Sequence, residues 1–278
     1  MRWVICALFA LAVAPSAYAG DFDILRGMQP VGPSNFYNWS GFYVGGQIGF
    51  GNATGDFSNA TSSSIAYILR DTALEYEFSP SSYPVLRTAN DDRMSFGGFV
   101  GYDTQWQDLV LGIEANYTQS QYSLNAPGTQ IGRVEPVDSN GNVWTVIFNG
   151  NGSATNLDYG TLRARAGLAL GNFLPYGFAG LALGQANITL STTGHAEANI
   201  PSSGPCSSFN TPPCYYISLD NTTVQTSLLY GLAVGGGMDF ALTHNIFVRS
   251  EFEYDRFAPV SDIVLSVISA RAGVGLRF

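Results

Sequence analysis

The sequence predicts an all-β protein, an eight-stranded antiparallel transmembrane β-barrel with long extracellular loops and short periplasmic turns. Eight segments of about ten residues alternate large apolar residues with small or charged ones, which is the period of a strand with two different faces. The connections between these segments alternate between short and long. Charged residues make up only 12% of the chain, whereas glycine (32 residues) and aromatic residues (13%) are abundant. Soluble domains are about 25% charged, so this composition favours a β-protein that faces something other than water.

The predicted strands are all of one amphipathic kind. In the first, Phe42, Val44 and Ile48 share a face, opposite Tyr43. The others repeat this alternation, except that 174–185 is apolar on both faces, which leaves its orientation open. The eight segments are 40–51, 94–104, 109–118, 161–170, 174–185, 228–240, 246–257 and 264–278.

The lengths of the connections distinguish the two ends of the predicted barrel. Short turns follow the second, fourth and sixth strands, at 105–108, 171–173 and 243–245. Connections of about thirty or forty residues, rich in Ser, Asn, Thr, Gly and Pro, follow the first, third and fifth strands. A compact soluble domain seldom carries several such loops, whereas an outer-membrane barrel has short turns at one rim and long loops at the other.

The apolar face of the strands is predicted to point outward. The interior of an eight-stranded barrel only just fits side chains, so the large apolar face would overfill it. An arginine that faces lipid at mid-depth costs about 2–4 kcal/mol, which favours an inward position for the charged face. The predicted interior ion-pair network comprises Asp103, Glu114, Arg163, Arg165, Asp239, Arg249, Glu251, Glu253 and Arg271, with Asp255 also inward and Arg277 at the rim.

The near balance of acids and arginines in this network indicates what it does. Unpaired buried charge is costly, so we expect the charges to pair and to form a polar plug that specifies strand register. The alternative is an ion or solute pathway, which would favour an open lumen and more strands.

Residues 1–19 are typical of a secretory signal peptide. An apolar stretch from Trp3 to Ala14, too short to anchor the chain in a membrane, is followed by Ala17-Tyr18-Ala19, an A-x-A cleavage site. The alternative is a retained N-terminal helix. Residues 20–38 are predicted to form a periplasmic lead-in, and residues 39–278 the barrel.

Two cysteines, Cys206 and Cys214, lie in the third long connection. The periplasm is oxidising, so we predict a disulfide that makes a surface hairpin rigid. Two free thiols are the alternative. Without nearby histidines the two cysteines are a poor metal site, and we expect neither a metal nor a cofactor.

The charge and the histidines argue against two classes of function. The formal net charge is −9 and lysine is absent, which makes the chain a poor partner for nucleic acid. Catalysis by a nucleophile needs a base beside it, but the two histidines are His195, in the third long connection, and His244, in a turn at the opposite rim. We therefore predict that the chain is not an enzyme.

Four blocks of the sequence resemble a known family: NWSGFYVGGQIGFG, GGFVGYDTQWQDLVLGIEANYT, GTLRARAGLALGNFLPYGFAGLALG and ARAGVGLRF. Together they look like the RopB-type outer-membrane immunogenic proteins, in the superfamily of OmpA-like transmembrane barrels, from Trp39 to Phe278. The resemblance implies a monomeric barrel in the outer membrane, in contact with lipid and lipopolysaccharide. It also implies that the last strand, which ends at Phe278, is the signal read by the barrel-assembly machinery.

Two functions fit these expectations. One is a structural protein that maintains the envelope and presents its long loops for adhesion or immune recognition, with host or environmental surface ligands as partners. The other is a narrow porin-like channel for small solutes. A channel gives steady single-channel conductance steps and a plugged barrel does not.

Overall fold

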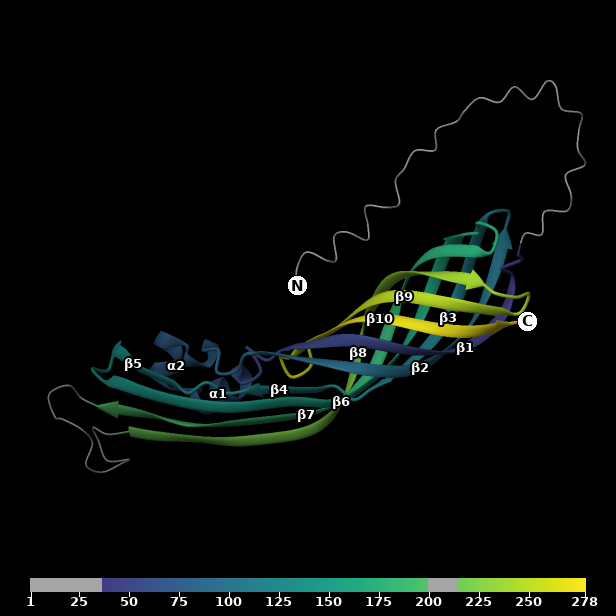
Figure 1. Ribbon diagram of the computed structural model, residues 1–278. Helices are drawn as coiled ribbons and strands as arrows, with labels where there is room; N and C mark the ends of the chain where they lie inside the picture. Colours follow the sequence, from purple (N-terminus) through teal and green to yellow (C-terminus); the bar gives the residue numbers. More distant parts are fainter. Residues whose placement is uncertain (1–36, 200–214) are drawn as a thin grey trace, which may run out of the picture. The chain divides into compact units, whose positions relative to one another are not determined.

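A computed structural model describes residues 37–199 and 215–278 (Figure 1). The predicted signal peptide, most of the predicted lead-in and the two loop cysteines, Cys206 and Cys214, lie outside these residues. The described part is dominated by antiparallel β-sheet. Its helices fall short of the length and apolarity that a membrane crossing demands.

Eight strands close into a ring. The order around the ring is β1, β2, β3, β6, β7, β8, β9 and β10, with β10 paired to β1 and β3 paired to β6. This arrangement confirms the predicted antiparallel barrel, and each predicted strand overlaps an observed one. The bounds are β1 Gly41–Asp56, β2 Thr88–Trp106, β3 Leu109–Ser120, β6 Val143–Leu168, β7 Phe173–Asn199, β8 Tyr215–Ala241, β9 Ile246–Phe257 and β10 Val264–Arg277.

Short turns join β2 to β3, β6 to β7 and β8 to β9, where the sequence predicted them. In the β6–β7 turn, Leu170 and Phe173 exchange backbone hydrogen bonds of 2.8 and 3.2 Å. Gly171 has a φ of 65° there, a conformation that glycine adopts without the strain a Cβ would cause. The ring itself leaves no sheet edge at its seam, which is the condition for a β-sheet to lie in hydrocarbon.

Side chains alternate between the lumen and the outer surface with the predicted parity. In β10, Val274 and Leu276 are 54% and 47% exposed, whereas Arg271 and Arg277 are 4% and 3% exposed. Apolar side chains therefore cover the outer surface of the barrel, and the charged residues of the network line its interior.

The orientation of β7, which the sequence left open, is decided by its neighbour. Leu181 and Leu183 are exposed on the outer surface, while Tyr176 and Phe178 are buried in the lumen. Gly235 of β8 lies opposite Phe178, and a Cβ at that glycine would collide with the phenylalanine ring. The aromatic ring occupies the space that the glycine leaves free.

Three strands continue beyond the ring. β6, β7 and β8 have 26 or 27 residues, against 12 in β3 and β9. Their far halves pair with each other, and two short strands, β4 (Ser123–Pro127) and β5 (Ile131–Val137), pair with β6. The sequence predicted loops for these stretches, but the structure shows a β-sheet. We call this part, with the far halves of β6, β7 and β8, the external sheet.

Two short helices between β1 and β2 cover one face of the external sheet. They are α1 (Ser62–Leu69) and α2 (Ala73–Phe78), followed by a 3-10 turn, η1 (Pro80–Ser82). Buried apolar side chains of the helices form one cluster with side chains of the sheet. Each fully buried side chain of this size stabilises the folded state by about 1.5–3 kcal/mol, which holds the sheet together beyond the ring. The cluster contains Ile65, Leu69 and Leu74 of the helices and Trp144, Val146 and Phe148 of β6.

Two adjacent glycines of β1 test the assignment of inner and outer faces. A Cβ at Gly45 would collide with the Phe99 ring in the lumen, whereas a Cβ at Gly46 would find no heavy atom closer than 3.9 Å. We expect Gly45→Ala to lower the free energy of unfolding by about 1–3 kcal/mol, because the packed interior has no room for a methyl group. The matched control, Gly46→Ala, should change it by about 0.5 kcal/mol or less. Urea unfolding in detergent micelles measures both, and equal effects would contradict the assignment.

Candidate functional site

Buried ion pairs fill the middle of the lumen. Arg163 contacts three carboxylates, those of Glu114, Glu251 and Glu253, and its Nη2 lies 2.7 Å from Oε1 of Glu251. Glu253 also accepts a hydrogen bond of 2.6 Å from Nη2 of Arg271. All five side chains are at most 4% exposed. Arg163 is therefore the centre of one half of the network.

Arg249 is the centre of the other half. Its Nη1 lies 2.7 Å from Oε2 of Glu114, and its Nε lies 2.9 Å from Oδ1 of Asp239. Arg165 lies 2.8 Å from Asp239 and 3.7 Å from Asp103. Because Glu114 contacts both Arg163 and Arg249, it joins the two halves. The structure thus brings together all nine residues that the sequence placed in the interior network.

Aromatic rings complete this layer. Tyr43 donates a hydrogen bond of 2.7 Å to Glu114, and Tyr176 donates one of 2.6 Å to Glu251. Three guanidinium groups lie over rings, an attractive arrangement because the face of an aromatic ring is electronegative. The pairs are Arg163 with Phe178 (3.9 Å), Arg165 with Tyr176 (3.8 Å) and Arg249 with Phe99 (4.0 Å). The alternation placed Tyr43 and Phe99 on the inner parity, but nothing in it indicated that rings would stack on the arginines.

A tryptophan closes the lumen at the end with the short turns. Trp39 is fully buried, its backbone N–H donates to Gln105, and its indole N–H donates to the carbonyl of Gly171 at 3.2 Å. Arg277 donates to the carbonyl oxygen of Trp39 and forms an ion pair of 2.8 Å with Asp103. The sequence marked Trp39 as the start of the barrel but gave no sign that its side chain would enter the lumen.

Apolar side chains close the lumen at the opposite end. Phe57, Tyr122, Leu124, Phe257 and Leu265 are at most 2% exposed and belong to one cluster. They come from the residue that follows β1, from β9 and β10, and from β4 with the residue that precedes it. Within the described residues, the lumen is thus occupied at three levels: by Trp39, by the ion pairs and by this outer cluster.

The uncovered face of the external sheet has a different chemistry. It consists of every second residue of β6 from Thr145 to Thr155, of β7 from Asn187 to Glu197 and of β8 from Tyr216 to Thr226. Twelve of these eighteen residues are Ser, Thr or Asn, and none is buried. We call this surface the polar face.

The polar face continues the outer surface of the barrel. In β7 the outward residues are Leu181 and Leu183 and then, farther along the same parity, Asn187 and Thr189. In β6 an irregularity at Asn156, where φ is 55°, shifts the alternation by one residue and keeps the faces aligned. The change from apolar to polar side chains marks the level at which this surface leaves an apolar environment.

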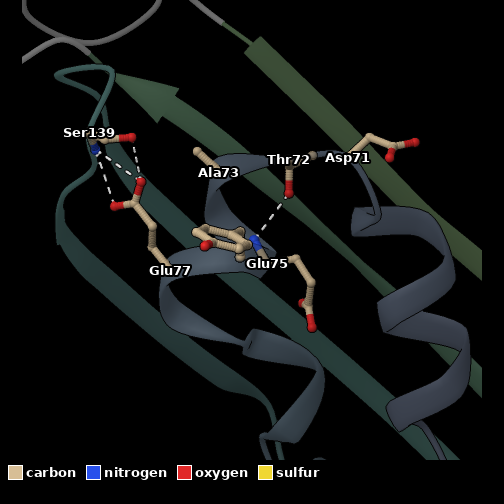
Figure 2. A pocket seen from close by; sticks show the side chains of 7 residues that line it. Asp71, Thr72, Ala73, Glu75, Glu77 and Ser139 are labelled. Carbon is tan, nitrogen blue, oxygen red and sulfur yellow. Dashed lines mark hydrogen bonds between the residues drawn. The ribbon is translucent and has the colours of Figure 1, made fainter.

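An open pocket lies between α2 and the turn that joins β5 to β6 (Figure 2). Glu77 accepts hydrogen bonds there from the backbone N–H and the hydroxyl of Ser139, at 3.1 and 2.5 Å. Thr72 caps α2 by accepting a hydrogen bond of 3.1 Å from the N–H of Glu75. Glu77 therefore fastens α2 to the turn between β5 and β6, which is a structural role.

The comparison with family models decides which family this is. The model of the outer membrane protein beta-barrel domain matches residues 4–278. The chain belongs to this family. The barrel therefore lies in the outer membrane, its apolar surface faces lipid, and its short turns lie at the periplasmic rim.

Individual relatives of this outer-membrane barrel are distant. A 22 kDa outer membrane protein of Rhizobium leguminosarum bv. viciae is 24% identical over 161 residues, which are 57% of this chain. The match spans about half of that curated relative, 51% of its length.

Solved barrels show the same general likeness. Ail, the attachment invasion locus protein of Yersinia pestis, is 14% identical with a TM-score of 0.36, over 86% of this chain and 99% of that one. OprG of Pseudomonas aeruginosa is 11% identical with a TM-score of 0.41, over 88% and 98%. Neisserial surface protein A is 16% identical with a TM-score of 0.33, over 86% and 98%. Scores below 0.5 say nothing about the function of this barrel.

The ion pairs predict a large difference between two arginine substitutions in this outer-membrane barrel. Arg163→Ala removes the guanidinium that three buried carboxylates share, and we expect the free energy of unfolding to fall by about 3–5 kcal/mol. The control is Arg93→Ala, because Arg93 is half exposed in its ion pair with Asp91 and should contribute about 1 kcal/mol or less. Unfolding in lipid vesicles measures both values. A loss at Arg163 no greater than that at Arg93 would show that the network does not hold the barrel together.

Asp138 makes the stability of the external sheet depend on pH. Burial by itself raises the pKa of Asp138, but hydrogen bonds from the Asn142 N–H (2.8 Å) and the Trp144 indole (2.9 Å) outweigh it and hold the pKa below its ordinary value. A carboxylate with a lowered pKa stabilises the folded state at neutral pH, and this contribution is lost as the pH falls through the lowered pKa.

We therefore expect the backbone amides of residues 138–148 to exchange faster, relative to their intrinsic rates, below about pH 4. Hydrogen exchange with mass spectrometry measures this change. Asp138→Asn should lack the pH step, because an amide does not titrate in this range, and a step that persists in the variant would assign it to another group.

Proposed function

We propose that this outer-membrane barrel is a structural protein of the envelope, whose closed lumen carries an external sheet for contact at the cell surface. The filled lumen is the observation that carries the proposal. A solute would have to displace Trp39, separate the ion pairs around Arg163 and pass the apolar cluster at Phe57. Uncoupling one partner of a buried ion pair costs about 3–5 kcal/mol, so a static opening is unfavourable.

The external sheet supports the surface role. Far more of the chain lies beyond the ring than a closed barrel needs, and it is folded around its own apolar cluster. A folded extension presents a fixed surface, which suits adhesion or immune recognition of host or environmental ligands. The RopB-type resemblance, finer than the family match, points in the same direction.

The remaining partners follow from the location. We propose a monomer in contact with lipid and lipopolysaccharide, assembled by the barrel-assembly machinery through its last strand. The exposed ring of Phe278 and its backbone hydrogen bond of 2.9 Å to Phe42 place that residue at the seam of β10 and β1. The disulfide between Cys206 and Cys214 stays a prediction.

We propose no catalytic role. His195 lies in the external sheet, where its ring stacks on Tyr216 with a centroid distance of 5.4 Å, and His244 lies in the β8–β9 turn. The two histidines therefore belong to opposite ends of the barrel. Lipid A that keeps its composition when the protein is overexpressed is the result expected for a protein without lipid-hydrolase activity.

Conductance in planar bilayers tests the closed lumen. We expect the refolded full chain to give no steady single-channel steps in bilayers where a general porin, the positive control, gives them. The reason is that buried ion pairs and packed side chains leave no continuous aqueous path. Steady, large conductance steps from the purified protein would refute the structural role and support a channel function.

A further inference from the structure

We propose that the polar face of the external sheet is a binding surface for neutral polysaccharide. The proposal rests on the surface role proposed above and names both the surface and the chemical class of its ligand. The polar face is the one defined by Thr145–Thr155 of β6, Asn187–Glu197 of β7 and Tyr216–Thr226 of β8, taking every second residue.

The first argument is the segregation of charge on the external part of the molecule. Of the eighteen residues of the polar face, two are acidic and none is arginine, although surfaces in water carry about 25–35% charged residues. Other exposed charges lie on the opposite, helix-covered side, for example Arg70, Asp71 and Glu77. Depletion of charge in one region of a wetted surface is typical of an interface.

The second argument is the hydrogen-bonding lattice of the polar face. Positions on the polar face repeat about every 6.8 Å along each strand and about every 4.8 Å from strand to strand, and twelve of the eighteen carry the hydroxyl or amide group of Ser, Thr or Asn. Thr222 already donates to Ser191 at 3.2 Å, and Thr226 donates to Asn187 at 2.8 Å, so neighbouring groups share one plane of donors and acceptors. Hydroxyl and amide groups both donate and accept, which matches the hydroxyl groups of a sugar chain.

The third argument is an aromatic pair at the far end of the polar face. The rings of His195 and Tyr216 are stacked with an interplanar angle of 24°, and both are only partly buried. A ring with a polar edge supplies apolar contact area at a low cost in conformational entropy. Such a platform suits the apolar face of a sugar ring.

The same features disfavour other ligands. A protein partner needs large apolar anchors at the centre of its interface. The aliphatic residues here are the exposed Val224 and the partly buried Ile147, and they lie far apart on the polar face. Anionic glycans and lipid headgroups need basic groups, but the polar face carries Glu197 and Asp220 instead, on a chain of net charge −9. Neutral sugar polymers need neither large apolar anchors nor basic groups.

The test uses the refolded full chain in lipid nanodiscs. The probes are maltohexaose, cellohexaose, mannohexaose and dextran fragments, together with dextran sulfate as the charged counterpart of dextran. We expect at least one neutral probe to bind and dextran sulfate not to bind. The face variant Asn149→Ala/Thr193→Ala removes two exposed polar side chains and should weaken binding about tenfold or more. The matched control, Ser63→Ala/Tyr76→Ala, removes exposed side chains from the helix-covered side and should bind as the unaltered chain does.

Three results would overturn the proposal: no neutral probe bound, tighter binding of dextran sulfate, or equal loss in the face variant and the control. Hydrogen exchange of residues 143–155 is measured in both variants. Faster exchange there would show that a loss of sugar binding is due to unfolding of the external sheet.

An adhesion assay with cells that display the protein distinguishes failure of the sugar-binding proposal from failure of the surface role. Adhesion to protein-coated surfaces by a chain that binds no neutral sugar would refute the ligand class and retain the surface role. Failure to adhere to any coated surface would refute the surface role itself.

Discussion

Charge inside a lipid-surrounded cylinder must be neutralised locally, and the rest of this structure depends on that constraint. Arg163 and Arg249, joined through Glu114, form its centre. Each guanidinium contacts at least two carboxylates and lies over an aromatic ring, so the desolvation of the buried charges is offset by contacts on several sides. Because these carboxylates come from β3, β8 and β9, the pairing links strands on different sides of the ring.

The constraint explains where the glycines and the aromatic residues lie. A network of long side chains, with rings stacked on it, fits an eight-stranded barrel only where the adjacent strand has glycine beside each ring. Gly45 leaves room for Phe99, and Gly235 leaves room for Phe178. A glycine-rich sequence is therefore the counterpart of a lumen filled with large polar and aromatic groups.

Where the strands leave the membrane, water replaces lipid around them, and each face of the strands then contacts a different environment. The surface that lines the lumen continues into the external sheet as an apolar face covered by α1 and α2. The surface that meets lipid continues as the polar face, with Asn187 and Thr189 following Leu181 and Leu183. One set of strands thus serves two environments, because side chains on a strand alternate independently of what each face contacts.

The sequence by itself determined the barrel, its inner and outer parities and the members of the charged network. Period-two alternation survives in any context, and an arginine on the lipid side is costly enough to exclude that arrangement. Tertiary structure decided the orientation of β7, the entry of Trp39 into the lumen and the external sheet. In 174–185 both parities are apolar, so the orientation depends on contacts inside the lumen: the space beside Gly235 that admits Phe178 and the hydrogen bond from Tyr176 to Glu251. The segments that form the external sheet are rich in Ser, Asn and Gly, a composition typical of loops. They form strands because α1 and α2, distant in sequence, bury Trp144, Val146 and Phe148.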